Sequence, residues 1–379
     1  RACDTEICSF IYFTKPTDTL MKNSLPSPQS TEKSQGLKAA WDQLKVAEPG
    51  LRIREAAEKL GVSELELLIT GVGEDVSWLR PEPQAILQAL EPLGELMGLT
   101  RNDHAVIERK GIYQNFTFFD AHHMGQAVNP DIDLRLFMRH WKYCLAVAVM
   151  ARGKVRNSIQ FFDGAGTALH NFYTLPEGEE GASQALHDQF RSESQPGERG
   201  VPPAADYKPQ NGQPEPEALR RDWEALQDTH DFVHLLRKHK THRLEANHLV
   251  GSDLAFPLAA GSLDVLLERA AENQTPIMVF VGNHGIIQIH TGPIRKVARM
   301  GIWENVLDPK FNLHVNTEAI SEAWVVRKPT VDGIVTSVEF YDHDGAIVLQ
   351  CFGKRKPGLP ELPEWRSLID ALPLISIPS

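Results

Sequence analysis

Residues 158–163, Ser-Ile-Gln-Phe-Phe-Asp, return almost unchanged as residues 337–342, Ser-Val-Glu-Phe-Tyr-Asp. The two stretches are 337 − 158 = 179 residues apart, and the glycines that follow them, Gly166 and Gly345, keep the same offset. Self-similarity at a fixed period indicates an internal repeat, so the sequence predicts that one unit of roughly 160 residues occurs twice. A tandem duplication therefore organises the chain.

Within each repeat, the pattern predicts helices first and strands afterwards. Apolar residues recur at three- and four-residue spacing over residues 37–68 and 217–250, which is typical of amphipathic helices. Apolar strand-like runs follow, and Asp342-His-Asp-Gly345 has the composition of a hairpin turn. A parallel doubly wound sheet would alternate strands with helices. This order instead predicts an α+β fold of two similar halves, each with N-terminal helices and a large antiparallel sheet.

Composition divides the chain into four segments. We expect the first repeat half over residues 37–176 and the second over residues 216–379. Residues 177–215 are rich in Pro, Gly and Glu, which predicts a linker, interrupted by a short helix over Ser183–Ser192. By the same reasoning, residues 1–36 are expected to form a flexible leader.

The whole chain has the composition of an acidic globular protein. Its 379 residues contain 39 Lys and Arg against 50 Asp and Glu, a formal net charge of −11. Because this charge repels polyanions, we expect binding neither to nucleic acid nor to anionic membranes. The longest apolar run, Tyr143–Ala151, is far shorter than the roughly 20 residues of a membrane span. Four cysteines in 379 residues do not indicate a disulfide framework, so we expect a cytoplasmic protein. Cys144 and Cys351 lie in apolar strand-like runs, and we expect both in the core.

Sequence motifs of several common enzyme classes are absent. The sequence has no Gly-x-Gly-x-x-Gly after a strand, no P-loop, no His-Glu-x-x-His, no Gly-x-Ser-x-Gly and no Cys-x-x-Cys. We therefore expect no nucleotide cofactor and neither a zinc protease nor an α/β-hydrolase.

Histidines gather in the helical segment that begins near Asp228, namely His230, His234, His239, His242 and His248. When the two repeats are aligned at the offset of 179, His230 is aligned with Leu51, so the first repeat has no equivalent histidine. A solvated helix face with incidental histidines is one interpretation. His230 and His234 could also bind zinc, but no third ligand is spaced to complete that site. The third interpretation is one axial imidazole for a planar iron cofactor, whose carboxylates Arg and Lys would bind.

Several motifs resemble one known family. They are Asp228-Thr-His-Asp-Phe232, Pro276-Ile-Met-Val-Phe-Val-Gly-Asn283, Val326-Arg-Lys-Pro-Thr330, Gln350-x-Phe-Gly353 and, in the first repeat, Asp131-Ile-Asp-Leu-Arg-Leu136. These motifs are similar to those of the cytoplasmic haemin-degrading or haemin-transport proteins of Gram-negative haem uptake, the HemS/ChuS/PhuS type. The resemblance covers roughly residues 37–366. It implies two similar α+β halves with haem in a cleft between them.

The resemblance also implies a haem site. The proximal iron ligand of the family corresponds to His230, and its distal arginine, catalytic if the protein is an enzyme, corresponds to Arg135. The contacts to the propionates and the rim correspond to Arg243, Lys328, Gln350, Phe352 and Arg355. Some members have a tyrosine in place of Phe352, so a hydrogen bond is lost there. The implied cofactor is haem b, iron protoporphyrin IX, without zinc.

The resemblance leaves three functions open. The protein could be a carrier that accepts haem imported by an inner-membrane haem ABC transporter and delivers it to a haem oxygenase. It could instead be an enzyme that cleaves haem oxidatively and releases iron. Because no flavin or nicotinamide motif is present, such an enzyme would need an external reductant. The third function is a haem-responsive regulator.

Overall fold

The computed structural model of the chain describes residues 32–151, 154–175, 180–204, 212–229, 231–355 and 358–374. Its contacts divide the chain into two compact units. Unit 1 comprises residues 1–100, 109–205 and 283–287, and unit 2 comprises residues 101–108, 206–282 and 288–379. Each unit therefore takes one short segment from the repeat that supplies most of the other unit.

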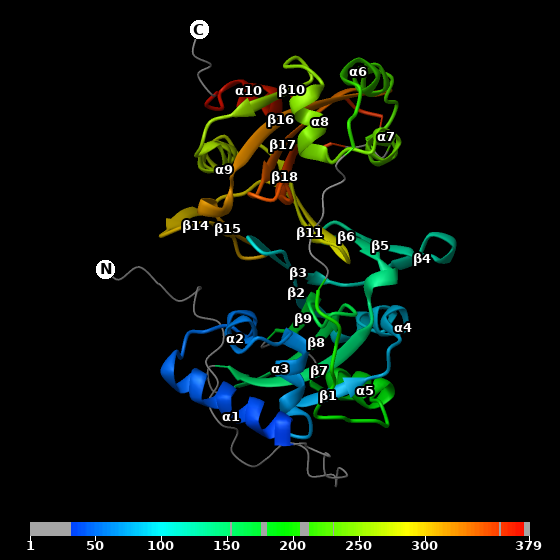
Figure 1. Cartoon of the computed structure of the whole chain (residues 1–379), viewed down its shortest axis with the longest axis vertical. Coiled ribbons are helices and arrows are strands. Elements are labelled where there is room, and N and C mark those ends of the chain that lie inside the picture. Colours follow the sequence, from blue (N-terminus) through cyan, green and yellow to red (C-terminus); the bar gives the residue numbers. More distant parts are fainter. Residues whose placement is uncertain are drawn as a thin grey trace. The chain divides into compact units, whose positions relative to one another are not determined.

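Each repeat begins with three short helices (Figure 1). In the first repeat these are α1 (Glu32–Ala47), α2 (Ile53–Leu60) and α3 (Glu64–Leu68), and in the second α6 (Pro216–Glu224), α7 (Asp231–His239) and α8 (Arg243–Leu249). Gly61 ends α2 with a φ of 66°, a left-handed conformation that glycine adopts without strain. Ser63 then caps α3 by accepting a hydrogen bond from the Glu66 N–H. These signals divide the predicted helical stretch 37–68 into separate helices.

The described strands form two nine-stranded antiparallel sheets. The strand order of the first is β1 (Val76–Leu79), β7 (Tyr143–Ala151), β8 (Lys154–Phe162), β9 (Ala168–Thr174), β2 (Glu95–Arg101), β3 (Ala105–Ile112), β15 (Phe311–Asn316), β14 (Trp303–Leu307) and β13 (Val297–Met300). That of the second is β10 (Ala255–Leu258), β16 (Glu322–Thr330), β17 (Gly333–Tyr341), β18 (Ile347–Gly353), β11 (Ile277–Asn283), β12 (Ile286–Gly292), β6 (Asp133–Phe137), β5 (Met124–Val128) and β4 (Phe116–Phe119). The predicted α+β fold is confirmed.

The strand positions confirm the duplication. The first residues of β7 and β16 are 322 − 143 = 179 positions apart, and the same offset relates β8 to β17 and β9 to β18. The last three strands in each strand order, however, come from the other repeat. Sequence periodicity did not predict this exchange, because strands of both repeats have the same local pattern and only long-range pairing distinguishes them.

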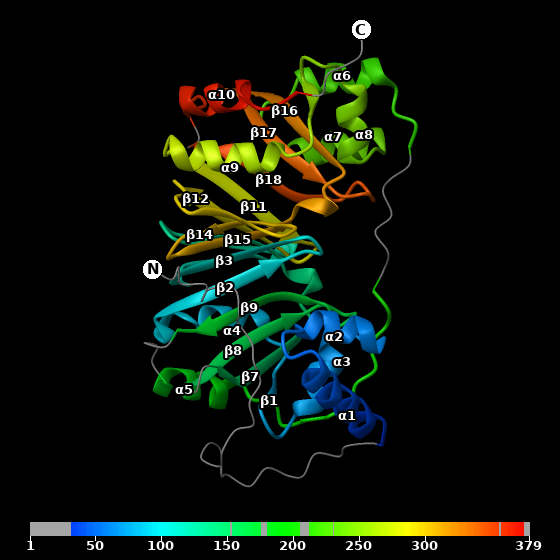
Figure 2. The same ribbon diagram turned by 90° about the vertical axis from the view of Figure 1, so that its left-hand side faces the viewer.

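Helices cover one face of the central strands in each repeat (Figure 2). These helices are α4 (Pro83–Gln88) and α5 (Glu180–Phe190) in the first repeat, and α9 (Ser262–Glu272) and α10 (Pro363–Asp370) in the second. Their apolar residues pack with the sheet in two large clusters, which bury Cys144 and Cys351 as predicted. The short helix expected within the linker is confirmed as α5. The described chain contains no helix with the length and hydrophobicity of a membrane span.

Short 3₁₀ helices, η1 (Ile69–Gly71), η2 (Glu91–Leu93), η3 (Asp120–His122), η4 (Met138–His140) and η5 (Thr317–Ala319), connect some of these elements.

A buried histidine on β9 predicts acid sensitivity. The His170 ring is 1 % exposed, contacts Phe172, and places Nδ1 at 2.7 Å from the Thr100 hydroxyl. Burial lowers the pKa of His170 to about 3, whereas an unfolded histidine titrates near 6.5. Between these values the unfolded chain binds more protons, so stability present at neutral pH is lost as the pH falls. Unfolding by urea should show a loss of ~2–3 kcal/mol from this residue between pH 7 and pH 4.5.

The residue at the equivalent position of the second repeat suggests a variant that tests the predicted acid sensitivity. Leu349 occupies the equivalent position, 349 − 170 = 179, so His170→Leu should reduce the difference in stability between the two pH values. His248→Leu, at a half-exposed histidine, serves as the control and should retain the wild-type difference. An unchanged pH dependence in His170→Leu would assign the acid sensitivity to other groups.

Candidate functional site

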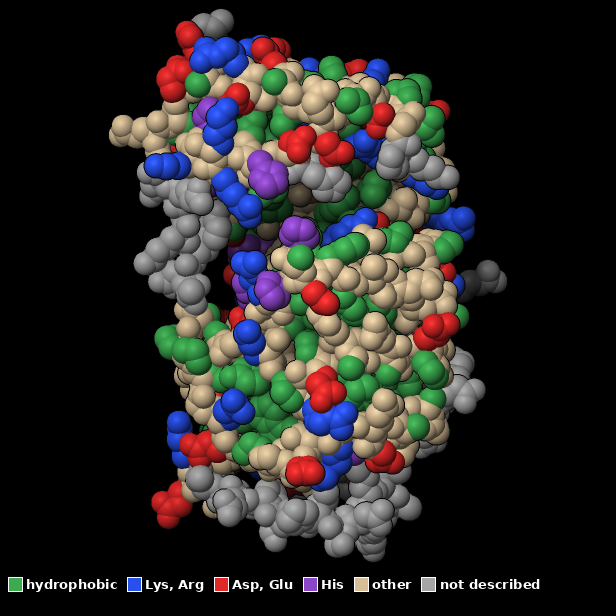
Figure 3. All heavy atoms as spheres, turned by 90° about the vertical axis from the view of Figure 1, so that its right-hand side faces the viewer, with side chains coloured by type: hydrophobic (Ala, Val, Ile, Leu, Met, Phe, Trp, Pro, Cys, Tyr) green, Lys and Arg blue, Asp and Glu red, His purple; other side chains and the backbone are tan. Residues whose placement is uncertain are grey.

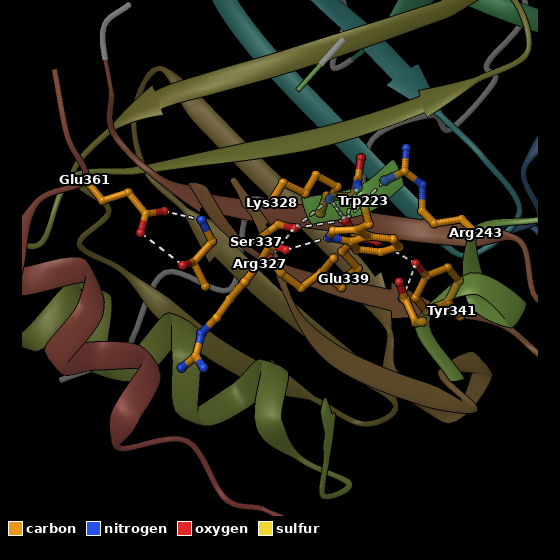
Figure 4. A network of polar contacts seen from close by, with 12 residues as sticks. Trp223, Arg243, Arg327, Lys328, Ser337, Glu339, Tyr341 and Glu361 are labelled. Carbon is orange, nitrogen blue, oxygen red and sulfur yellow. Dashed lines mark hydrogen bonds and ion pairs between the residues drawn. The ribbon is translucent and has the colours of Figure 1, made fainter. Parts of the chain in front are cut away.

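A buried carboxylate on β17, Glu339, is the centre of a polar cluster in unit 2 (Figure 4). Its side chain is fully buried. Its Oε1 accepts hydrogen bonds from Ser337 Oγ (2.9 Å), Gln350 Nε2 (2.9 Å), Lys328 Nζ (3.0 Å) and Arg243 Nη1 (3.2 Å). The Tyr341 hydroxyl donates to Oε2 and accepts from Asn247 Nδ2 at 3.0 Å. Three residues that the resemblance assigned to the haem site, Arg243, Lys328 and Gln350, thus meet at one carboxylate.

Sheet geometry explains why these side chains converge. Alternate residues of a strand point to the same face, so Ser337, Glu339 and Tyr341 share one face of β17. The register places Gln350 of β18 directly opposite Glu339. Lys328 reaches the same carboxylate from β16, the neighbour on the other side. Arg243, the first residue of α8, approaches from the helical part of the repeat.

The cluster holds more positive than negative charge. Lys328 and Arg243 against Glu339 leave a formal charge of +1. Burial opposes ionisation of Glu339, but the two cations outweigh it and hold the pKa of that carboxyl well below its usual range. Burial lowers the pKa of Lys328 to about 8, although Glu339 favours the charged form. Burial and the adjacent carboxylate raise the pKa of Tyr341, which therefore stays a neutral donor.

Phe232 of helix α7 packs against the two cations of this cluster. Its ring centroid lies 4.5 Å from Lys328 Nζ and 4.8 Å from Arg243 Cζ, within cation–π range. The Trp223 ring packs edge-on against it at 4.6 Å. Phe232 is the second residue of α7, so these contacts fix the first turn of the helix. His230, the predicted iron ligand, immediately precedes this helix and lies outside the described residues.

Two further predicted site residues lie on or just after β18. Phe352 is two residues from Gln350, on the same face of the strand, and its ring lies 4.9 Å from that of Phe280. Arg355, beyond the end of β18, forms an ion pair of 3.6 Å with Asp332. The contacts of Arg355 are therefore separate from those of the Glu339 cluster.

The predicted distal residue, Arg135, belongs to unit 1. It lies on β6, directly opposite Gln126 of β5, whose side-chain oxygen accepts a hydrogen bond from Nη1 at 3.3 Å. Asp133 on the same strand forms an ion pair with it at 3.0 Å. Burial raises the pKa of Asp133, although the Arg135 charge opposes this. A third of the Arg135 side chain remains exposed, so it is accessible to a ligand.

Sequence reasoning missed Glu339 and Tyr341, although a signal was present. At the offset of 179, the first repeat has Gln160 in place of Glu339 and Phe162 in place of Tyr341. In that repeat Gln160 Nε2 donates to Ser158 Oγ, at 3.0 Å. The repeated motif thus differs between the copies at the position of the buried charge, Glu339, and at the position of the hydroxyl that donates to it, Tyr341.

Comparison with known proteins gives the family. A family model described as the haemin-degrading HemS/ChuX domain matches residues 61–190 and 240–372. The two matched segments begin 240 − 61 = 179 residues apart, the offset of the internal repeat. The chain belongs to this haemin-degrading family. The resemblance noted from its motifs is thereby confirmed.

The relatives in this family have different descriptions. The hemin transport protein HemS of Yersinia enterocolitica is 39 % identical over 331 residues, covering 87 % of this chain and 95 % of HemS. Holo-PhuS of Pseudomonas aeruginosa, described as a heme-binding protein, matches at a TM-score of 0.87 and 44 % identity over 90 % of this chain and 99 % of its own. ChuS of E. coli, described as a heme oxygenase, matches at 0.80 and 34 % identity over 89 % and 99 %. Family membership therefore leaves binding, transport and degradation to be distinguished.

Proposed function

We propose that this protein is a cytoplasmic haem carrier, which accepts imported haem and delivers it to a haem oxygenase. The observation that supports this most is the positively charged Glu339 cluster, attached through Phe232 to the helix that follows His230. Haem carries two carboxylates beside an apolar ring. Binding it needs a metal ligand and fixed cations close together.

Each residue has a distinct part in this proposal. His230 provides a neutral imidazole for the iron. Arg243 and Gln350, which are partly exposed, donate to the propionates. The Lys328 side chain is only 4 % exposed, so it acts on the ligand through its charge. Histidine, lysine and arginine side chains are among those exposed on the face that Figure 3 shows, although the net charge of the chain is −11.

Haem degradation is the second candidate function. It is favoured by the match to ChuS, a structure described as a heme oxygenase. The two functions differ in the fate of haem, so a single-turnover experiment separates them. The haem-loaded protein is given a reductase and dioxygen in the presence of catalase, and the products are identified by mass spectrometry. A carrier keeps haem intact, whereas an oxygenase yields one equivalent of an opened tetrapyrrole and free iron.

Catalase is essential to this experiment. Free peroxide oxidises haem in an open site without enzymatic control, so loss of haem only when catalase is omitted still supports the carrier. Transfer is then measured by mixing haem-loaded protein with a haem-free oxygenase. If no haem is transferred, and one equivalent of opened tetrapyrrole forms in the presence of catalase, the protein is a haem-degrading enzyme and not a carrier.

Arg135→Ala tests the proposed distal role. A guanidinium stays protonated at any working pH and can hydrogen-bond a water on ferric iron. Its removal should leave haem bound but shift the pH at which the ferric absorption spectrum changes between its acid and alkaline forms. Arg139→Ala, at an exposed arginine close in sequence, is the matched control. If both variants titrate like the wild type, Arg135 does not contact the distal side.

A further inference from the structure

Unit 1 contains a cavity that the haem proposal does not use. It lies between α5 and the central strands of the first repeat (Figure 2), and all its lining residues belong to unit 1. None of the described residues assigned above to haem lines it. Its volume is about 160 Å³, close to the ~150 Å³ of an engineered apolar cavity that binds benzene. Apolar side chains form much of its wall, namely Leu93, Leu96, Ala146, Ile159, Phe172 and Leu186.

Helix α5 beside the cavity and helix α10 of the second repeat are equivalent at an offset of 183 residues. Their first residues are 363 − 180 = 183 positions apart. The same offset relates two carbonyls that accept equivalent hydrogen bonds, since Arg80 N donates to Phe190 and Ala259 N donates to Pro373. The two donors keep the offset of the repeat, 259 − 80 = 179. The second repeat therefore has four more residues between its last strand and its helix.

This alignment places Trp365 of α10 opposite Ala182 of α5, which packs against the apolar cluster of unit 1. The Trp365 indole is fully buried, and its Nε1 donates to the Thr336 carbonyl at 3.0 Å. The residue equivalent to Thr336 is Asn157, which lines the cavity. The first repeat thus has a methyl group in place of an indole, and this substitution accounts for the open space.

A second substitution limits the size of that space. The indole packs tightly against Gly353, because a Cβ added there would lie 2.5 Å from Cγ and 2.8 Å from Cδ1 of Trp365, both in the five-membered ring. The residue equivalent to Gly353 is Thr174, which lines the cavity. Its side chain takes the place of the five-membered ring. Space for one six-membered ring remains, in agreement with the cavity volume.

The Thr174 hydroxyl also leaves one polar group of the cavity wall available. It accepts a hydrogen bond from Asn157 N and donates one to the Asn157 carbonyl, both at 3.2 Å. Both bonds use the backbone of Asn157. Its side-chain amide has no hydrogen-bond partner among the described residues. An amide both donates and accepts, so it suits a hydroxyl group.

The two carboxylates among the lining residues provide no charged partner for a ligand. Glu74 forms an ion pair with Lys38 of α1. The Asp75 carboxylate lies against Gly71. A charged ligand would therefore lose its hydration without compensation, which favours a neutral molecule.

We propose that this cavity binds a small neutral molecule with a single aromatic ring, of the class of the phenols. The ring occupies the space that corresponds to the six-membered ring of Trp365 in the second repeat. The hydroxyl group bonds to the side-chain amide of Asn157. This site is independent of haem and separate from the function proposed above.

Phenol is the probe for this site, and indole is the comparison ligand that is one ring larger. Titrated calorimetrically into the haem-free full chain, phenol should bind saturably at one site, and indole about tenfold or more weakly. Thr174→Gly should reverse this order, because glycine is the residue that admits the indole of Trp365 in the second repeat. Haem-loaded protein should bind phenol with the same affinity as haem-free protein.

Ala182→Trp copies the second repeat into the cavity and should abolish phenol binding. Ala185→Trp is the matched control, because Ala185 lies on the same helix and is exposed, so it should bind phenol as the wild type does. Should Ala182→Trp fail to fold, the double variant Ala182→Trp, Thr174→Gly provides the glycine that the indole needs, and the reversal in Thr174→Gly decides independently. Absence of saturable binding, loss of phenol on haem loading, or an unchanged preference in Thr174→Gly would each overturn the proposal and leave the cavity as a packing defect.

Discussion

Glu339→Gln is expected to lower the free energy of unfolding of the ligand-free protein by about 3 kcal/mol or more. The carboxylate is fully buried and compensates two cations, Lys328 and Arg243. Glutamine has the same shape but no charge, so it leaves both cations uncompensated. The pKa of Lys328, already lowered to about 8, should fall further. Urea unfolding followed by circular dichroism measures the loss, which should be smaller at pH 9 than at pH 7, because Lys328 is then neutral in the folded state.

The first repeat provides the compensating change. Gln160 and Val149 stand at the positions of Glu339 and Lys328, so the double variant Glu339→Gln, Lys328→Val copies a pair that this fold already contains. The double variant should recover at least half of the free energy of unfolding that Glu339→Gln loses. Glu361→Gln is the control. Glu361 is also buried, but its described hydrogen bonds go to Thr336, and the arginine that pairs with it, Arg366, is half-exposed, unlike the buried Lys328. A double variant no more stable than Glu339→Gln would show that charge compensation is not the main role of Glu339.

Among the variants proposed here, His230→Ala is expected to lower the affinity for haem the most. Loss of groups that merely support metal ligands costs about 10- to 100-fold in affinity, so loss of the ligand itself should cost at least about 100-fold. The Soret band should also shift, because the iron loses its imidazole. Absorption titration with haemin measures both.

His234→Ala is the matched control for this prediction. It lies one helical turn further along α7 and its side chain is exposed, so its removal should leave affinity and spectrum unchanged. If His230→Ala binds haem as the wild type does, the iron ligand is another residue. If both variants lose affinity, the helix rather than one imidazole is required.

Much of the fold could be predicted from the sequence, because its determinants are local. The period-2 pattern of β17 and the turn at Asp342–Gly345 repeat the pattern of β8 and the turn after it, so a comparison of the chain with itself locates both repeats. A short helix within the Pro- and Gly-rich segment was likewise expected over Ser183–Ser192, and the structure has α5 there over Glu180–Phe190. Boundaries were less accurate, since Gly61 and Ser63 divide a stretch whose periodicity alone suggested one helical region.

The candidate site was predictable only in part. Differences between the repeats at the offset of 179 singled out His230, Arg135, Lys328 and Gln350. The family resemblance added Arg243. No pattern along the chain indicated that Lys328, Arg243 and Gln350 share Glu339. They come from two strands and a helix, and their meeting depends on strand register and on the position of α8.

The duplication, the α+β class, the family and the residues in which the two repeats differ could all be predicted from the chain, because each is recorded in residue identity and local spacing. The folded structure was needed to show that three strands of each repeat join the sheet of the other and that Glu339 pairs with two cations next to Phe232. Hydrogen-bonded pairing and side-chain packing join residues far apart in the chain. Their energies depend on distances in space that periodicity does not encode.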